Sequence, residues 1–148
     1  MTAAGASYGA NGGGRAPAGP QPPVTSAALR RWCLDRPGAT EEFPFGEEHS
    51  VFKVAGKMFA LSALAAEPLK VSLKCEPELA ARLRATHPAI VAGYHLSKRH
   101  WNTVTIDGSL PGASIADMLE DSYDLVVTGL PRRTQRELGW APGLDTDR

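Results

Sequence analysis

The residues Leu69-Lys-Val-Ser-Leu-Lys74 alternate strictly between apolar and polar side chains. Successive side chains of a β-strand point to opposite faces of its sheet. This alternation therefore predicts a strand with one face buried and the other turned to solvent. Antiparallel sheets commonly have one such solvated face, so we expect an antiparallel sheet with helices covering one side of it.

Further strands are predicted on either side of this stretch. Ser50–Val54 and Lys57–Ser62 flank the tight turn Ala55-Gly56, in which Gly56 supplies a positive φ, and they form a hairpin. Downstream, we expect a short strand at Tyr94–Leu96 and a longer one at Trp101–Ile106. These segments give five strands.

Three helices are predicted around the strands. They run from residue 25 or 26 to about 36, from 77 to about 86, and from 114 through 126, each with apolar residues on one side. The residue types at their starts suit helix caps or first turns: Thr25 or Ser26, Pro77, and Ser114 with Asp117 three residues on. In the loop of residues 39–49, Phe43 and Phe45 are expected to anchor the chain to the core.

The predicted order is α-β-β-β-α-β-β-α. It indicates one α+β domain over residues 24–138, with an antiparallel five-stranded sheet and helices mainly on one face. Residues 1–23 are mostly Gly, Ala and Pro and are expected to be disordered, because they offer little apolar surface to bury. Residues 139–148 are expected to form a flexible tail. A membrane span and an export signal are both unexpected, and the cytoplasm is the predicted compartment.

Charge is segregated along the chain although the net charge is zero. Residues 41–50 hold four acids, residues 51–106 hold eight bases against three acids, and residues 107–130 hold five acids. The densest basic stretch is Lys98-Arg99-His100, directly before Trp101. Such a block is typical of a surface that meets phosphates, with the indole stacking on a base.

The candidate DNA-binding residues follow from this block and from the polar sides of the strands. Lys98, Arg99, His100 and Trp101 would form the central contact. Four further lysines would contact phosphates: Lys53, Lys57, Lys70 and Lys74. In the last strand, Trp101, Thr103 and Thr105 are expected to point outward.

Other interpretations of the same residues remain open. Lysines also protect exposed strands from aggregation, and the Lys98-Arg99 pair could be neutralised by the acids of residues 41–48 or of the last helix. An exposed sheet face or edge strand would equally suit a protein- or peptide-binding adaptor. A small-molecule-binding module is a third alternative.

Catalysis and metal binding have little support in the sequence. The serines lie in no nucleophile motif, and the glycine-rich tail does not join a strand to a helix as a phosphate loop does. Cys75 and the histidines match no zinc spacing. Cys33 and Cys75 are expected to be reduced, largely buried thiols, and we expect no enzyme activity, catalytic residue, cofactor or metal.

Several long segments resemble the MmcQ/YjbR family of small bacterial proteins. They include Pro37-Gly-Ala-Thr-Glu-Glu-Phe-Pro-Phe-Gly46, Gly56-Lys-Met-Phe-Ala60 and Gly93-Tyr-His-Leu-Ser-Lys-Arg-His-Trp-Asn-Thr-Val104. The resemblance spans roughly residues 29–138, and the Gly/Pro-rich tail lies outside it.

The resemblance implies a compact α+β domain, related in shape to secretion-chaperone-like folds, and a DNA-binding role through two wing-like loops. The Ala55-Gly56 turn would be one wing and the segment around Tyr94–Trp101 the other. The family brings no catalytic residue and no cofactor. DNA is therefore the expected partner, with a protein partner as the alternative.

Overall fold

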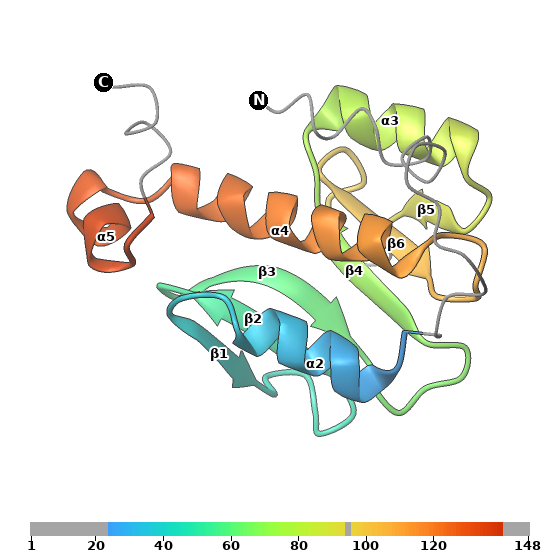
Figure 1. The fold of residues 1–148 in the computed structure, drawn as a ribbon, viewed down its shortest axis with the longest axis horizontal. Coiled ribbons are helices and arrows are strands. Elements are labelled where there is room, and N and C mark those ends of the chain that lie inside the picture. Colours follow the sequence, from blue (N-terminus) through green and yellow to red (C-terminus); the bar gives the residue numbers. More distant parts are fainter. Residues whose placement is uncertain (1–23, 94–95, 141–148) are drawn as a thin grey trace.

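The computed structural model describes residues 24–93 and 96–140. Its centre is one six-stranded antiparallel sheet with the strand order β1-β2-β3-β4-β6-β5. The strands are β1 (Ala39–Glu42), β2 (Ser50–Val54), β3 (Lys57–Ser62), β4 (Lys70–Lys74), β5 (Ile90–Ala92) and β6 (Trp101–Thr105). The helices are α2 (Ser26–Leu34), α3 (Pro77–Thr86), α4 (Gly112–Thr128) and α5 (Arg132–Glu137), and Figure 1 shows their arrangement.

The predicted α+β class and antiparallel sheet are confirmed, but the sheet has six strands, not five. The additional strand, β1, lies in the predicted loop of residues 39–49 and pairs with β2 at the edge of the sheet. Its sequence Ala-Thr-Glu-Glu carries no apolar alternation, because β1 turns Glu41 toward the protein. The Glu41 carboxylate meets Arg30 at 2.7 Å and accepts a hydrogen bond from Ser50.

Other element boundaries also differ from the prediction. The short strand next to β6 is Ile90–Ala92, which was not predicted. The strand predicted at Tyr94–Leu96 includes Tyr94 and His95, which lie outside the described residues. Helix α4 begins at Gly112, two residues before the predicted Ser114. The short helix α5 was not predicted, because its sequence Arg-Arg-Thr-Gln-Arg-Glu has no apolar side.

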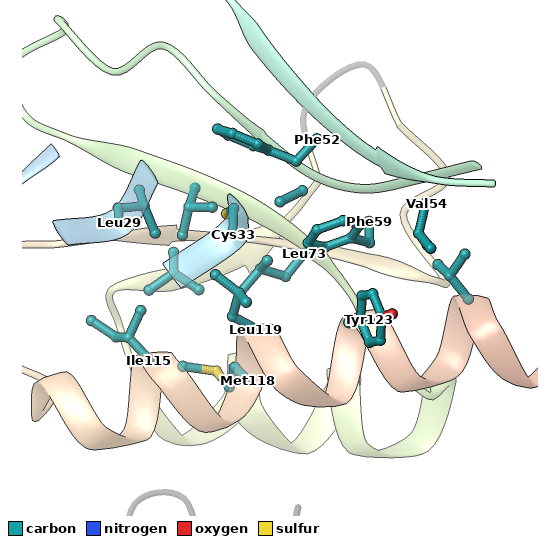
Figure 2. Close-up of a cluster of buried hydrophobic side chains, with 14 of the residues drawn as sticks. Leu29, Cys33, Phe52, Val54, Phe59, Leu73, Ile115, Met118, Leu119 and Tyr123 are labelled. Atoms are coloured by element: carbon teal, nitrogen blue, oxygen red, sulfur yellow. The ribbon is translucent and has the colours of Figure 1, made fainter. Parts of the chain in front are cut away.

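The core lies between the sheet and its helices. Helix α4 packs on β3 and β4, α2 on β1, and α3 on β5 and β6. Figure 2 shows Ile115, Leu119 and Tyr123 of α4 pointing toward Phe59 and Leu73 of the sheet. The rings of Phe59 and Tyr123 meet edge to face, with centroids 5.3 Å apart. The helices thus cover one face of the sheet, as predicted.

A β-bulge at Phe59 shapes this core. Phe52 pairs with Ala60 and Lys53 with Met58, so Phe59 is an extra residue in β3, and both Phe59 and Ala60 are fully buried. The hydroxyl of Ser122 in α4 donates to the Phe59 carbonyl at 2.7 Å and accepts from the Lys74 amide at 2.9 Å. One helix side chain therefore satisfies backbone groups of two strands where their own pairing stops.

Candidate functional site

The open face of the sheet carries a continuous row of side chains across four strands. The register places Val91 of β5 opposite Thr103 of β6, Thr103 opposite Ser72 of β4, and Ser72 opposite Leu61 of β3. The neighbours of these residues along the strands, such as Leu73 and Val104, belong to the helix-covered core. Because side chains alternate between faces, the row lies on the side that the helices leave open.

A groove of about 840 Å³ lies over this row. This volume is within the range of about 300–1,000 Å³ of ligand-binding pockets in proteins. More than half of its lining residues are apolar: Phe45, Leu61, Ala63, Val91, Ala92 and Leu96. Two of them are exposed to an unusual degree, Phe45 at 65% and Val91 at 53%.

The polar lining of the groove is small and unevenly placed. The hydroxyls of Ser72 and Thr103 lie on the floor, 2.7 Å apart, and form a hydrogen bond with each other. Both residues are less than a tenth exposed. Because these two hydroxyls already form a hydrogen bond with each other, a ligand on the floor does not need to supply a hydrogen-bond partner for them.

The charged end of the groove lies where β4 begins and β3 ends. Lys70 and His49 both line the groove there and are exposed, and the Ser62 hydroxyl beside them donates to the Lys70 carbonyl. Among the described residues that line the groove, none is acidic. The groove therefore combines an apolar surface with one fixed positive charge and an imidazole.

The prediction that Phe43 and Phe45 anchor their loop to the core is wrong. Phe43 is 50% exposed and Phe45 65% exposed, and neither belongs to the core cluster. The segment between β1 and β2 instead places Phe45 and His49 at the groove. Two phenylalanines two positions apart in a Pro/Gly loop look alike in sequence, and only the fold separates Phe45, which lines the groove, from Phe43, which does not.

The predicted central contact of Lys98, Arg99 and His100 forms an exposed turn at the start of β6. Arg84 of α3 holds this turn by donating to the Lys98 carbonyl at 3.2 Å and to the Asn102 side-chain oxygen at 2.8 Å. Within the described parts of the chain, neither Lys98 nor Arg99 belongs to an ion pair. The acids of β1 have other partners, since Glu41 pairs with Arg30 and Glu42 with Lys53.

Trp101 differs from the prediction in its exposure. The register places it opposite Lys74, on the predicted face, but it is only 9% exposed. The Gly93 amide donates to the Trp101 carbonyl at 2.8 Å, and a Cβ on Gly93 would lie 2.8 Å from the Cβ of Trp101. The chain that leaves β5 therefore packs closely on Trp101, and the indole is not free to stack on a base.

The four predicted lysines on strands do not gather into one patch. Lys74 lies opposite Trp101, beside the Lys98–His100 turn, whereas Lys70 lies opposite Thr105 at the other end of β4, about 13 Å along the strand. The Nζ atom of Lys53 is 3.0 Å from a Glu42 carboxylate oxygen. Lys57 is exposed beside the β2–β3 turn.

The two predicted wings lie on either side of α4. In Figure 1 the β2–β3 turn lies next to α5, whereas β6 begins across α4, next to α3. Between them, α4 carries the acids Asp117, Glu120, Asp121 and Asp124, of which Asp117 and Glu120 are exposed. A phosphate backbone that joined the two turns on this side would meet negative charge.

The two cysteines of the described residues lie in surroundings that disfavour the thiolate form. Burial raises the pKa of Cys33 to about 12 and that of Cys75 to about 11, so both free thiols stay protonated at neutral pH. No group of three metal-ligating side chains occurs within residues 24–93 and 96–140. In the same residues, no helix has both the length and the apolar character needed to cross a bilayer.

Sequence reasoning missed four contributors to this site: Phe45, Leu61, Val91 and Arg84. Leu61 follows from the strand alternation, because it occupies a position that faces away from the core. Val91 and Arg84 had no local signal, since their roles depend on the pairing of β5 with β6 and on the docking of α3 against Asn102.

The comparisons with known proteins agree on one family. The family model described as YjbR matches residues 34–125. YjbR of Escherichia coli K12 is 35% identical over 115 residues, which cover 78% of this chain and 98% of that protein. YbdF of Escherichia coli O157:H7 is 35% identical over 109 residues, which cover 74% and 89% respectively.

Two solved structures have the same fold. Protein DR2400 of Deinococcus radiodurans superimposes with a TM-score of 0.75 at 40% identity, covering 84% of this chain and 94% of that one. A protein from Pseudomonas syringae superimposes with a TM-score of 0.58 at 27% identity, covering 67% and 96%.

Proposed function

The chain belongs to the YjbR family, and from that premise we propose that it is a non-enzymatic binding protein that receives an apolar segment of a partner protein in the groove on the open face of its sheet. The peptide-binding alternative raised from the sequence is thereby placed first. The observation that carries the proposal is the groove itself, which the apolar side chains of Phe45 and Val91 line while staying more than half exposed. Exposed apolar clusters of this kind mark interaction sites.

The shape of the groove supports a peptide that contacts side chains. From β3 to β5 the floor crosses three strand spacings, about 14 Å, which an extended peptide covers with four or five residues. Such a peptide would place alternate side chains between Leu61 and Val91. Catalysis is not part of the proposal, because no hydroxyl among the described lining residues is paired with a base: Ser72 and Thr103 form a hydrogen bond with each other, and Ser62 donates to the Lys70 carbonyl.

The test is selection of a random 12-residue peptide library on the immobilised full chain. We expect selected peptides to lose about tenfold in affinity for Phe45→Ser and for Val91→Thr, because an apolar anchor of the groove is removed. Phe43→Ser is the matched control, since Phe43 is also at least half exposed in the same loop but does not line the groove. Peptides that ignore Phe45→Ser, or that lose affinity equally to Phe43→Ser, would overturn the proposal.

DNA binding is the second candidate, favoured by the exposed Lys98-Arg99-His100 turn, whose cations have no acidic partner among the described residues. Lys74 lies beside this turn and would extend it. The burial of Trp101, the Lys53–Glu42 pair and the acids of α4 count against a wider interface. For that reason we rank DNA binding below the binding of a peptide in the groove.

Titration of labelled duplex DNA at several salt concentrations tests this second candidate. A backbone contact predicts affinity that falls steeply with salt, and Lys98→Ala/Arg99→Ala should reduce the slope of log K against log salt by about 2. Lys57→Ala tests the wider interface predicted from the sequence: if the contact is confined to the Lys98-Arg99-His100 turn, this change leaves the slope unaltered. If the protein fails to bind duplex DNA at low salt, this candidate is wrong.

A further inference from the structure

We infer that the partner segment is acidic as well as apolar: an extended peptide whose alternate apolar side chains enter the groove while a neighbouring aspartate or glutamate meets Lys70 and His49. This inference rests on the proposed function and adds the charge of the partner. It depends on where the groove's polar side chains lie.

Lys70 supplies the fixed charge. It is the first residue of β4, it is exposed, and within the described chain its ammonium belongs to no ion pair. A lysine ammonium offers three donors and no acceptor, so a carboxylate is its natural partner.

His49 completes the same end of the groove. It precedes Ser50, which lies opposite Ser62 on β3, and Lys70 lies on the other side of β3. The backbone at these two positions therefore lies on either side of the end of β3, about two strand spacings or 10 Å apart, and both side chains line the groove. A carboxylate above Ala63 would lie between an ammonium and an imidazole N–H.

The acids nearest to this end in the sequence do not fill the position. Glu47 and Glu48 in the loop before His49 are exposed, as is Glu67 three residues before Lys70, but none of the three lines the groove. The opposite end is apolar, formed by Val91, Ala92 and Leu96. An apolar ligand without an acid would leave Lys70 unpaired, whereas a basic one would face repulsion.

A second copy of this chain is a poorer occupant. The exposed acids of α4 face solvent, but the apolar residues of that helix are already buried in its own core. Helix α4 therefore does not offer a free apolar side together with its acids to a neighbouring molecule. A partner protein with an acidic, apolar segment fits better.

The experiment uses the peptides selected on the full chain in the preceding test. We expect the selected set to be enriched in Asp and Glu next to apolar residues. For a selected peptide, replacing its acids by the corresponding amides should weaken binding about threefold per acid at 0.1 M salt, and 0.5 M salt should remove most of the difference. In Lys70→Gln, the acidic and amide forms should bind equally.

The controls separate this inference from the proposed function. Lys57→Gln removes an exposed lysine outside the groove and should leave the acid preference unchanged. Groove-dependent peptides with no acid preference would overturn the inference and leave the proposed function standing. Loss of all dependence on Phe45 would overturn both.

Two further outcomes assign the groove to another occupant. If sodium dodecanoate bound with the same dependence on Lys70 while no peptide did, the ligand would be a small amphiphile. If sedimentation of the protein alone showed a dimer that Val91→Thr dissociates, the occupant would be a second copy. Either result would overturn the inference.

Discussion

On its helix-covered side the sheet buries Phe52 and Phe59 completely, whereas on its open side Phe45 and Val91 keep 65% and 53% of their surface exposed. Val91 belongs to a strand of this same sheet, whereas Phe45 comes from the segment between β1 and β2. The difference shows that the open side is not a uniformly polar, solvent-facing surface, because it carries exposed apolar side chains that line a groove. Val51 of β2 pairs with Leu61 and therefore lies on the open side, yet it is only 1% exposed. The open side is thus covered at its β2 end, and the groove extends from there toward β5.

The largest expected effect comes from comparing two phenylalanines, one on each side. Phe59→Ala should lower the free energy of unfolding by about 4 kcal/mol, because it leaves a cavity between the sheet and Tyr123. Phe45→Ala should change it by no more than about 0.5 kcal/mol, because the side chain is mostly in water already. Urea unfolding followed by fluorescence measures both, and similar losses would contradict the contrast.

Removal of the Ser122 hydroxyl, which links α4 to β3 and β4, should lower the free energy of unfolding by an intermediate amount. Ser122→Ala leaves the Phe59 carbonyl and the Lys74 amide without their partner and should cost about 2 kcal/mol. Thr128→Ala is the control on the same helix, since its exposed hydroxyl only donates to the Asp124 carbonyl of its own helix. Equal costs for the two variants would mean that the bridge across the bulge contributes nothing.

The smallest effect concerns the pH dependence of the helix-covered side. Burial, and then the neighbouring charge of Asp124, raise the pKa of Asp121 from 3.8 to about 6. Between pH 3.8 and about 6, the Asp121 carboxyl is protonated in the folded state and ionised in the unfolded chain. The stability that the neutral carboxyl allows is therefore fully present below pH 3.8 and is lost as the pH rises to about 6. After allowance for solvent screening, Asp121→Asn should gain about 1 kcal/mol at pH 7.

Thermal unfolding of both proteins across this range measures the Asp121 effect. The difference between Asp121→Asn and the unmodified chain should grow from pH 4 to pH 6 and then stay level. Asp117→Asn, at an exposed position of the same helix, provides the comparison. A difference that does not vary with pH would contradict the raised pKa.

Much of the fold was predictable because its signals are local. The alternation of Leu69–Lys74 and the Ala55-Gly56 turn gave three of the strands, and Gly56 has the expected positive φ of 81°. The Thr25 side chain caps α2 as predicted, by accepting from the Ala28 amide. Strand β1 was missed because an edge strand that buries a paired carboxylate carries no hydrophobic alternation.

The candidate site was less predictable than the fold. Lys98, Arg99 and His100 lie together because they are consecutive in the sequence. Their distance from Lys70, however, depends on the register in which β4 and β6 pair. The burial of Trp101 depends on Gly93, which lies in another segment of the chain. Neither the distance from Lys70 nor the burial of Trp101 can be recognised from the residues that neighbour these positions in the sequence.

The sequence by itself determined the α+β class, the hairpin, the presence of helices α2, α3 and α4, and the family, because side-chain periodicity and turn chemistry act over a few neighbouring residues. Only the tertiary structure decided that Phe45 lines a groove while Phe43 does not, and that Lys70 and His49 flank the end of one strand. Those facts follow from strand register and from how distant loops pack. Both are settled by contacts across the whole domain.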